Sequence, residues 1–202
     1  ISKIIQEKCM KKKKIILGSS SKFRKALFET LELDFTCLSP DIDESRLPNE
    51  KPNDMAIRLS IEKARKISNT LKNAIVIGSD ACAFCEGKIM GKPMNKDVAI
   101  EHLKYISDKT IIFYTGVCVM ESDTLNYKTD IAVYKIKIKN LNNDQIIDYV
   151  EKHKPYHSSA AFRYEVAKDF LIESFTDHED DISGLIGLPL KKLKVILGTY
   201  GF

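Results

Sequence analysis

Apolar runs and amphipathic stretches alternate along this chain, and the alternation predicts a mixed sheet flanked by helices. The uninterrupted apolar runs at residues 15–17 and 74–77 are typical of buried strands. Lysine and isoleucine alternate over residues 135–139, which indicates a strand with one buried face and one wet face. Strands are predicted at residues 15–17, 35–38, 74–77, 81–85, 88–90, 110–120, 127–139 and 169–175.

Helices are indicated where apolar positions recur at helical spacing. The longest is predicted to follow Pro52, with Asn53 or Asp54 as its N-cap, and to end near Leu71. The others are predicted at residues 22–31, 95–107 and 142–154 and in a short segment after residue 190.

The junction between the first strand and the first helix is rich in glycine, hydroxyls and cations. Gly18 and three serines precede Lys22, Arg24 and Lys25. Free backbone N–H groups and the helix dipole at such a junction favour an anion, and arginine can bind phosphate oxygens with both arms of its guanidinium. The segment therefore predicts a phosphate site or, equally, a capped helix with solvated cations, because the glycine-rich P-loop pattern is absent.

A lysine lies in the middle of the apolar side of the long helix. Lys63 shares that side with Ala56, Leu59, Ala64 and Ile67. Such a lysine either extends along its methylenes to solvent or meets an anion. The pattern by itself favours extension to solvent.

Four further segments carry candidate chemistry. Asp80 follows the strand at 74–77, and ligands gather where strands of α/β sheets end, so this carboxylate is a candidate for catalysis or metal binding, or else a turn former. The acidic loop at 41–48 and the small, polar stretch at 156–165 are predicted binding loops. Lys92, between Gly91 and Pro93, is placed for a ligand charge or is a surface turn residue.

Composition limits the class of protein. With 202 residues, 44% hydrophobic and 30% charged, the chain predicts one globular domain of residues 15–202, preceded by a disordered extension of residues 1–14. No apolar run is long enough to span a bilayer, and the first ten residues carry charge where a signal peptide needs an apolar core, so we expect a cytoplasmic protein without a membrane partner. The lysines at 11–14 lack interleaved aromatic residues, so no nucleic-acid partner is expected.

The five cysteines do not form a recognisable framework. Cys82 and Cys85 have the spacing of a zinc or redox pair, but the chain offers no second pair of ligands at matching spacing. We therefore expect free thiols.

Seven motifs in order resemble those of the Maf family of nucleoside triphosphate pyrophosphatases, over about residues 15–197. They are Gly-Ser-Ser-Ser-Lys-Phe-Arg-Lys at 18–25, Asp-Ile-Asp-Glu at 41–44, Glu-Lys-Ala at 62–64, Gly-Ser-Asp at 78–80, Gly-Lys-Pro at 91–93, Phe-Tyr-Thr-Gly at 113–116 and Gly-Leu-Pro-Leu at 187–190. The resemblance implies an elongated mixed α/β sheet in two lobes with a central cleft. It also implies cleavage of a nucleoside triphosphate to a monophosphate and pyrophosphate, a divalent cation (Mg²⁺ or Mn²⁺) and a homodimer.

The resemblance also implies roles for particular residues. Asp80 stands where the family has its general base, and Glu44 with Asp80 stands near the metal. The positions that hold the triphosphate in the family correspond here to Ser19, Arg24, Lys25, Lys63 and Lys92.

Within the family the chain is most similar to the branch that prefers 7-methyl-GTP. Phe23 and Glu165 are the specificity residues on this interpretation, because a cationic purine suits an aromatic face and a carboxylate. The chain departs from the family at Lys22, where proline is usual, at Ala81, where an amide is usual, and at Val166 and Ala167, where glycines are usual. Ala81 bears on base recognition.

Two alternative functions remain open. One is a pyrimidine nucleotide (dTTP or UTP) pyrophosphatase of the same family, and the other is a nucleotide-binding regulator of cell division without turnover.

Overall fold

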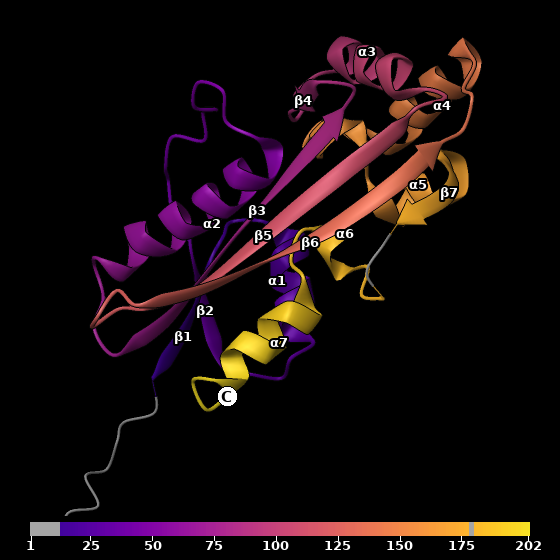
Figure 1. Ribbon diagram of the computed structural model, residues 1–202. Coiled ribbons are helices and arrows are strands. Elements are labelled where there is room, and N and C mark those ends of the chain that lie inside the picture. Colours follow the sequence, from indigo (N-terminus) through magenta and orange to yellow (C-terminus); the bar gives the residue numbers. More distant parts are fainter. Residues whose placement is uncertain (1–12, 178–179) are drawn as a thin grey trace, which may run out of the picture.

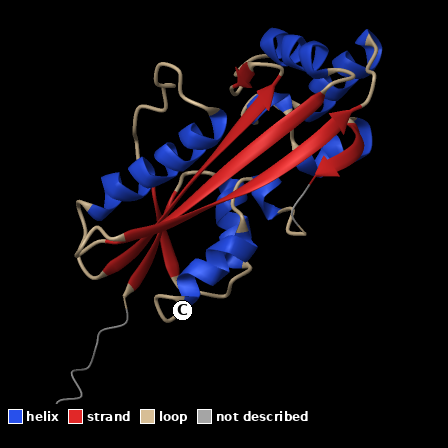
Figure 2. Cartoon of the chain, viewed as in Figure 1, coloured by secondary structure: helices blue, strands red, loops and turns tan. Residues whose placement is uncertain are grey.

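The molecule is built on one long twisted sheet that joins two lobes (Figures 1 and 2). The computed structural model describes residues 13–177 and 180–202, so most of the predicted N-terminal extension lies outside the described residues. The strand order is β2-β1-β3-β5-β6-β7, with β4 paired to β3. The strands are β1 (Lys14–Gly18), β2 (Phe35–Leu38), β3 (Ala74–Cys85), β4 (Lys88–Met90), β5 (Thr110–Glu121), β6 (Tyr127–Ile138) and β7 (Ile172–Asp177).

The pairing of the strands divides the sheet into a short parallel part and a long antiparallel part. β1 is parallel to both β2 and β3, whereas β3, β5, β6 and β7 pair antiparallel in sequence. β3, β5 and β6 have 12 residues each and extend through both lobes. This confirms the predicted mixed α/β sheet.

Helices cover both faces of the sheet. The helical segments are α1 (Lys22–Glu29), α2 (Pro52–Ser68), α3 (Lys96–Ile106), α4 (Asn143–His153), η1 (Ser159–Ala161), α5 (Tyr164–Phe170), α6 (Ser183–Ile186) and α7 (Leu190–Gly198). In the lower lobe of Figure 1, α2 lies on one face while α1 and α7 lie on the other. The upper lobe contains α3, α4 and α5. Within the described residues no helix combines the length and apolar character needed to cross a bilayer.

Side chains of β3 alternate between the two faces of the lower lobe. Ile75 and Ile77 pack with Phe28 and Leu193 on the side of α1 and α7. Val76 packs with α2 on the other face. Continuing the alternation, Ser79 points toward the first face and Asp80 toward the second. A separate apolar cluster fills the upper lobe.

Two glycines let α2 lie almost in backbone contact with the sheet. A Cβ atom on Gly78 would lie 2.1 Å from the carbonyl oxygen of Ser60, and one on Gly116 would lie 2.6 Å from that of Ala56. Gly116 is also the β5 partner of Asp80 in the strand register. The helix is therefore held closest to the sheet beside Asp80.

The structure corrects the predicted boundaries of two elements in the first half of the chain. β3 does not end before Asp80 but continues to Cys85, because β5 pairs with it without interruption from Ile75 to Phe84. Asp80 thus lies inside a strand. α2 begins at Pro52 itself, after Lys51, so neither Asn53 nor Asp54 is its N-cap, and it ends at Ser68.

A third correction concerns the segment after residue 163. Residues 164–170 form α5, and the last strand begins at Ile172 rather than at 169. The helix forms because Val166, Ala167 and Leu171 lie on one helical side and pack against the apolar cluster of the upper lobe.

The close approach of α2 generates a prediction about stability. We expect Gly78→Ala to lower the free energy of unfolding by about 2–4 kcal/mol, because backbone atoms of α2 cannot move away as a flexible side chain could. Urea denaturation followed by circular dichroism measures this. Gly198→Ala is the matched control: nothing lies within 4 Å of its added Cβ, so it should be neutral or stabilise by up to about 1 kcal/mol. Equal stability of the two variants would contradict the packing argument.

Candidate active site

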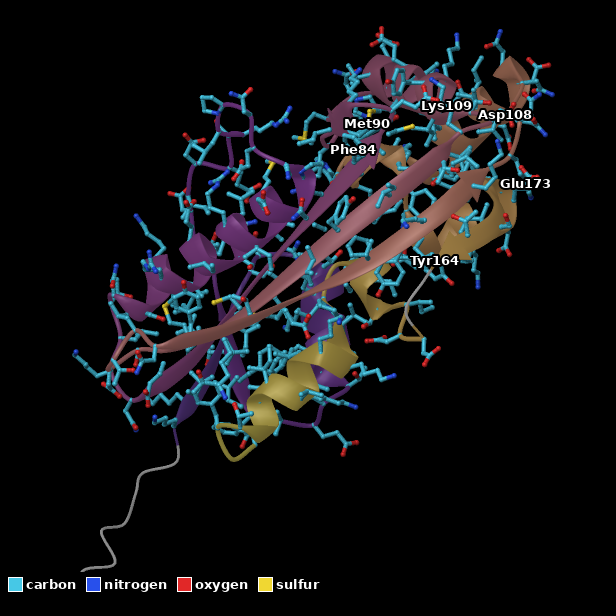
Figure 3. All side chains as sticks on the ribbon, in the orientation of Figure 1. Phe84, Met90, Asp108, Lys109, Tyr164 and Glu173 are labelled. Atoms are coloured by element: carbon cyan, nitrogen blue, oxygen red, sulfur yellow. The ribbon has the colours of Figure 1, made fainter. Side chains whose placement is uncertain are left out.

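A cavity of about 830 Å³ opens between the lobes and collects most of the predicted site residues. Its volume lies in the range of about 300–1,000 Å³ that is usual for small-molecule sites. Figure 3 labels two lining residues, Met90 of β4 and Tyr164 of α5. The predicted site residues that line it are Ser19, Phe23, Arg24, Glu44, Lys63, Asp80, Ala81, Lys92 and Glu165.

Lys25 is the predicted site residue that does not line the cavity. Its ammonium lies 3.8 Å from the carboxylate of Glu29, one turn further along α1, and its side chain is exposed. In the strand–turn–helix segment, the cations that face the cavity are thus Lys22 and Arg24.

Lys63 links the two carboxylates of the site. Its Nζ lies 2.5 Å from Asp80 Oδ1 and 2.7 Å from Glu44 Oε1, and the lysine is only 4% exposed. The expectation that Lys63 extends to solvent is therefore wrong. α2 packs closely on the sheet, and the ammonium meets two carboxylates at the edge of the cavity instead of extending into solvent.

The cations around Glu44 favour the ionised form of its carboxyl group. Partial burial opposes its ionisation, but the hydrogen bond from Lys63 and the charges of Lys63, Lys92 and Arg24 outweigh burial and hold the pKa of Glu44 below its usual value. Glu44 and Asp80 each place one oxygen on the Lys63 ammonium, so the second oxygen of each carboxylate is left for a ligand.

A second salt bridge holds the loop that carries Glu44. Arg58 of α2 contacts the Glu50 carboxylate through Nε at 2.5 Å and Nη2 at 2.9 Å, and Nη2 also donates to the Ser45 carbonyl at 3.1 Å. The hydrogen bonds from Arg58 lower the pKa of Glu50. The sequence did not single out Arg58, since it lies off the apolar side of α2 and its partners lie in an irregular loop.

The start of α1 is capped by two serine hydroxyls. Ser21 is the N-cap and its hydroxyl accepts from the Arg24 N–H at 3.4 Å, while the Ser19 hydroxyl accepts from the Ser21 N–H at 3.1 Å. The remaining N–H groups of the first turn and the helix dipole favour negative charge in the cavity.

Arg24 is fixed by the opposite end of the chain. Its Nε donates to the Gly187 carbonyl at 2.7 Å, and the Ser79 hydroxyl lies 3.0 Å from the same oxygen. Burial lowers the pKa of Arg24, and the charges of Asp80 and Glu44 oppose that effect. The guanidinium therefore stays charged and keeps its Nη groups for a ligand.

Lys92 comes to the cavity from the upper lobe. The Gly91 carbonyl accepts from the Ala160 N–H at 3.0 Å, and the Met94 N–H donates to the Tyr156 carbonyl at 2.9 Å. These bonds tie residues 91–94 to the polar stretch at 156–161, so both predicted binding segments form one wall.

The last wall contains Phe23, Glu165 and Arg163. The guanidinium carbon of Arg163 lies 5.6 Å from the centre of the Phe23 ring, and Arg163 Nε lies 3.7 Å from Glu165 Oε2. The sequence placed Arg163 in the predicted binding stretch at 156–165 but gave no signal for its contacts, because its partners are distant along the chain or inside a helix that was not predicted.

Cys82 and Cys85 do not form a metal or redox pair. Residues three apart in a strand point to opposite faces, and accordingly Cys82 lines the cavity while Cys85 packs in the upper apolar cluster. Burial raises the pKa of Cys82 to about 12, so its thiol stays protonated. Over residues 13–177 and 180–202, no group of three or more His, Cys, Asp or Glu side chains is placed to hold a metal by itself.

Comparison with known proteins gives one consistent result. The model of the family described as Maf-like protein matches residues 14–200. The chain is 39% identical over 189 residues to the 7-methyl-GTP pyrophosphatase of Colwellia psychrerythraea, covering 94% of both chains. It is 38% identical over 193 residues to the protein of that name from Vibrio parahaemolyticus, covering 96% of this chain and 98% of the relative. Among solved structures, the Staphylococcus aureus Ham1 protein covers 93% of this chain and all of its own, with a TM-score of 0.52 at 17% identity, which shows a shared fold.

The buried ion pair gives a prediction that a double-mutant cycle can test. Lys63→Met should lower the free energy of unfolding by about 3–5 kcal/mol, because it leaves the Asp80 carboxylate buried without its partner. Adding Asp80→Asn should restore part of the loss, measured by urea denaturation at neutral pH. Additive losses in the double variant would show that the two side chains are not coupled.

The Glu50 salt bridge predicts a pH dependence. The pKa of Glu50 is lower in the folded chain than in the unfolded one, so its contribution to stability is complete above the unfolded pKa and disappears as pH falls through the folded value. Glu50→Gln should therefore lower the free energy of unfolding by about 1–2 kcal/mol at pH 7. Below about pH 3 the loss should be much smaller. Melting temperatures of both proteins across this range measure the difference. A constant difference at all pH values would contradict the assignment.

Proposed function

The chain belongs to the Maf-like protein family, and from that membership we propose that it hydrolyses a nucleoside triphosphate, best 7-methyl-GTP, to the monophosphate and pyrophosphate. The observation that carries the proposal is one cavity lined by a helix N-terminus, by the cations Arg24, Lys63 and Lys92 and by the Asp80 carboxylate, which Lys63 contacts. The relatives named 7-methyl-GTP pyrophosphatase, similar over nearly their whole length, support the choice of substrate.

The triphosphate would bind along the lower-lobe wall of the cavity. Ser19, the first turn of α1 and the Nη groups of Arg24 offer hydrogen-bond donors there, and Lys92 offers a mobile charge from the facing wall. Lys25, which pairs with Glu29 outside the cavity, does not enter the proposed mechanism.

Asp80 is proposed as the general base. Water that attacks the α-phosphate must lose a proton to a positioned acceptor, and a carboxylate held by Lys63 is oriented for that task. The charge that develops on the departing pyrophosphate would be stabilised by Arg24, Lys63 and Lys92.

Glu44 and Asp80 are proposed to hold a divalent cation, Mg²⁺ or Mn²⁺. Their oxygens meet at one ammonium, and oxygen donors are the ligands such ions prefer. Mg²⁺ is commonly bound by one or two carboxylates together with substrate phosphates, so the pair fits the ion without a third protein carboxylate. When bound, the cation would neutralise charge on the phosphates.

Phe23 and Glu165 are proposed to select the methylated base. A purine made cationic by methylation is attracted by an aromatic face and a carboxylate, both of which line the cavity. Ala81, next to Asp80, offers no amide for base recognition, which leaves more of the selectivity to this pair. On the family resemblance alone, we also propose a homodimer in the cytoplasm.

The test is pyrophosphate release from 7-methyl-GTP, GTP, UTP, dTTP and ITP with Mg²⁺ or Mn²⁺. We expect turnover to be highest on 7-methyl-GTP and to stop when a chelator removes the metal. Asp80→Asn should lower kcat by about 100-fold or more, the usual contribution of a general base. Asp130→Asn is the matched control. Asp130 lies on β6 outside the cavity and pairs with Lys192 of α7, so the substitution should leave turnover intact.

The possible results separate the alternatives. Preference for UTP or dTTP would keep the reaction and discard the roles of Phe23 and Glu165. Turnover retained by Asp80→Asn would discard the proposed base. Nucleotide binding without any turnover would favour a regulatory protein.

A further inference from the structure

Arg163 occupies the aromatic end of the cavity. It is the residue just before α5, and it places its guanidinium carbon 5.6 Å from the centre of the Phe23 ring. Phe23 is the second residue of α1, lines the cavity and is 42% exposed with Arg163 in place. The guanidinium therefore lies over part of an aromatic ring that is still accessible from the cavity.

The contacts of Arg163 are incomplete. Its Nε lies 3.7 Å from Glu165 Oε2, too far for a normal hydrogen bond, and this buried nitrogen has no hydrogen-bond partner in the described part of the chain. The backbone of Arg163 is fixed, since its N–H donates to the Tyr149 hydroxyl at 3.3 Å. A fixed backbone with a loosely held side chain is suited to a head group that can leave its position.

Phe23 and Glu165 thus hold a planar cation in the free protein. A flat positive group over an aromatic ring and beside a carboxylate is also the chemistry of a purine methylated on its imidazole ring. We propose that Arg163 is an internal competitor for the base-binding end of the cavity: its guanidinium fills the place of a cationic base and must move aside when the nucleotide binds. The inference rests on the proposed function and adds to it the residue that sets the affinity for the base.

Two separable effects follow from this competition. Any base must displace the stacked guanidinium, so the apparent affinity is reduced by the fraction of molecules in which Arg163 covers the ring. In addition, the displaced cation remains near the site and repels a base that is itself positively charged. The first effect is common to methylated and unmethylated guanine nucleotides, and the second is confined to the methylated one.

Two variants at position 163 distinguish these effects. Stacking of a cation on an exposed ring corresponds to about a two- to fivefold change in binding, so Arg163→Ala should lower KM for 7-methyl-GTP by about three- to fivefold and KM for GTP by about twofold. Arg163→Lys loses the planar stack but keeps the charge, so KM should fall by about the same twofold factor for both nucleotides. Lys168→Ala, which removes an exposed cation from α5 outside the cavity, should change neither KM.

The proposal has two contrary outcomes. If Arg163→Ala raises KM for both nucleotides equally, the guanidinium binds the substrate, for instance its phosphates, and is not a competitor. If KM for both nucleotides and their ratio are unchanged, Arg163 has no part in base binding. Either result overturns the inference.

Direct binding separates this inference from the proposed reaction. Calorimetric titration with 7-methyl-GMP requires no turnover and compares the wild-type protein with Arg163→Ala. Tighter binding by the variant supports the competitor even if the wild type releases no pyrophosphate, in which case the proposed reaction alone fails. Equal binding in a wild type that does cleave 7-methyl-GTP overturns the competitor and leaves the reaction standing.

Discussion

The arrangement of this protein depends on how closely α2 lies against the centre of the sheet. Side chains normally separate a helix from a sheet, but Gly78 and Gly116 leave the helix backbone almost in contact with β3 and β5. At that separation the inward-facing Lys63 meets a buried anion instead of extending into solvent, and Asp80 on the same face of β3 supplies it. The close packing of α2 on β3 and β5 therefore contributes to the stability of the lower lobe and also orients the proposed base.

The other groups of the cavity are held from distant parts of the chain. The carbonyl of Gly187, between α6 and α7, accepts from Arg24 and lies within hydrogen-bond distance of Ser79, so the C-terminal segment fixes the start of α1 relative to β3. Arg58 fixes the loop of Glu44, and hydrogen bonds around Gly91 fix Lys92. The cavity-lining side chains of both lobes are thus positioned by hydrogen bonds to backbone carbonyls of residues distant along the chain.

The sequence predicts the elements of this fold better than the contacts of its site. The apolar run of β1 predicts that strand well, because a buried strand leaves a local pattern. The half-buried β2 was also predicted, and helical spacing predicts α3 and α4. The continuation of β3 through Asp80 could not be predicted from the local sequence. It depends on pairing with β5, in which Asp80 lies opposite Gly116, 36 residues further along the chain. The same is true of Lys63: its spacing showed a lysine on the buried side, but whether it meets an anion depends on a helix-to-sheet distance that has no local signal. The contact of Arg163 could not be predicted for a related reason: the residue lies in the predicted binding stretch at 156–165, but its aromatic partner is on α1.

Four of the groups proposed to meet a substrate or metal already have an internal partner. Glu44 and Asp80 share Lys63, and the Phe23 ring and Glu165 face Arg163. Partnering lowers the free energy of an empty polar cavity, because an isolated charge in a partly buried place is costly. It also means that binding is an exchange of partners rather than a simple addition of contacts. The net affinity for a nucleotide is then the difference between its contacts and the internal ones it replaces. Weak internal contacts, such as the 3.7 Å approach of Arg163 to Glu165, are therefore the ones at which a small change in sequence most readily changes selectivity.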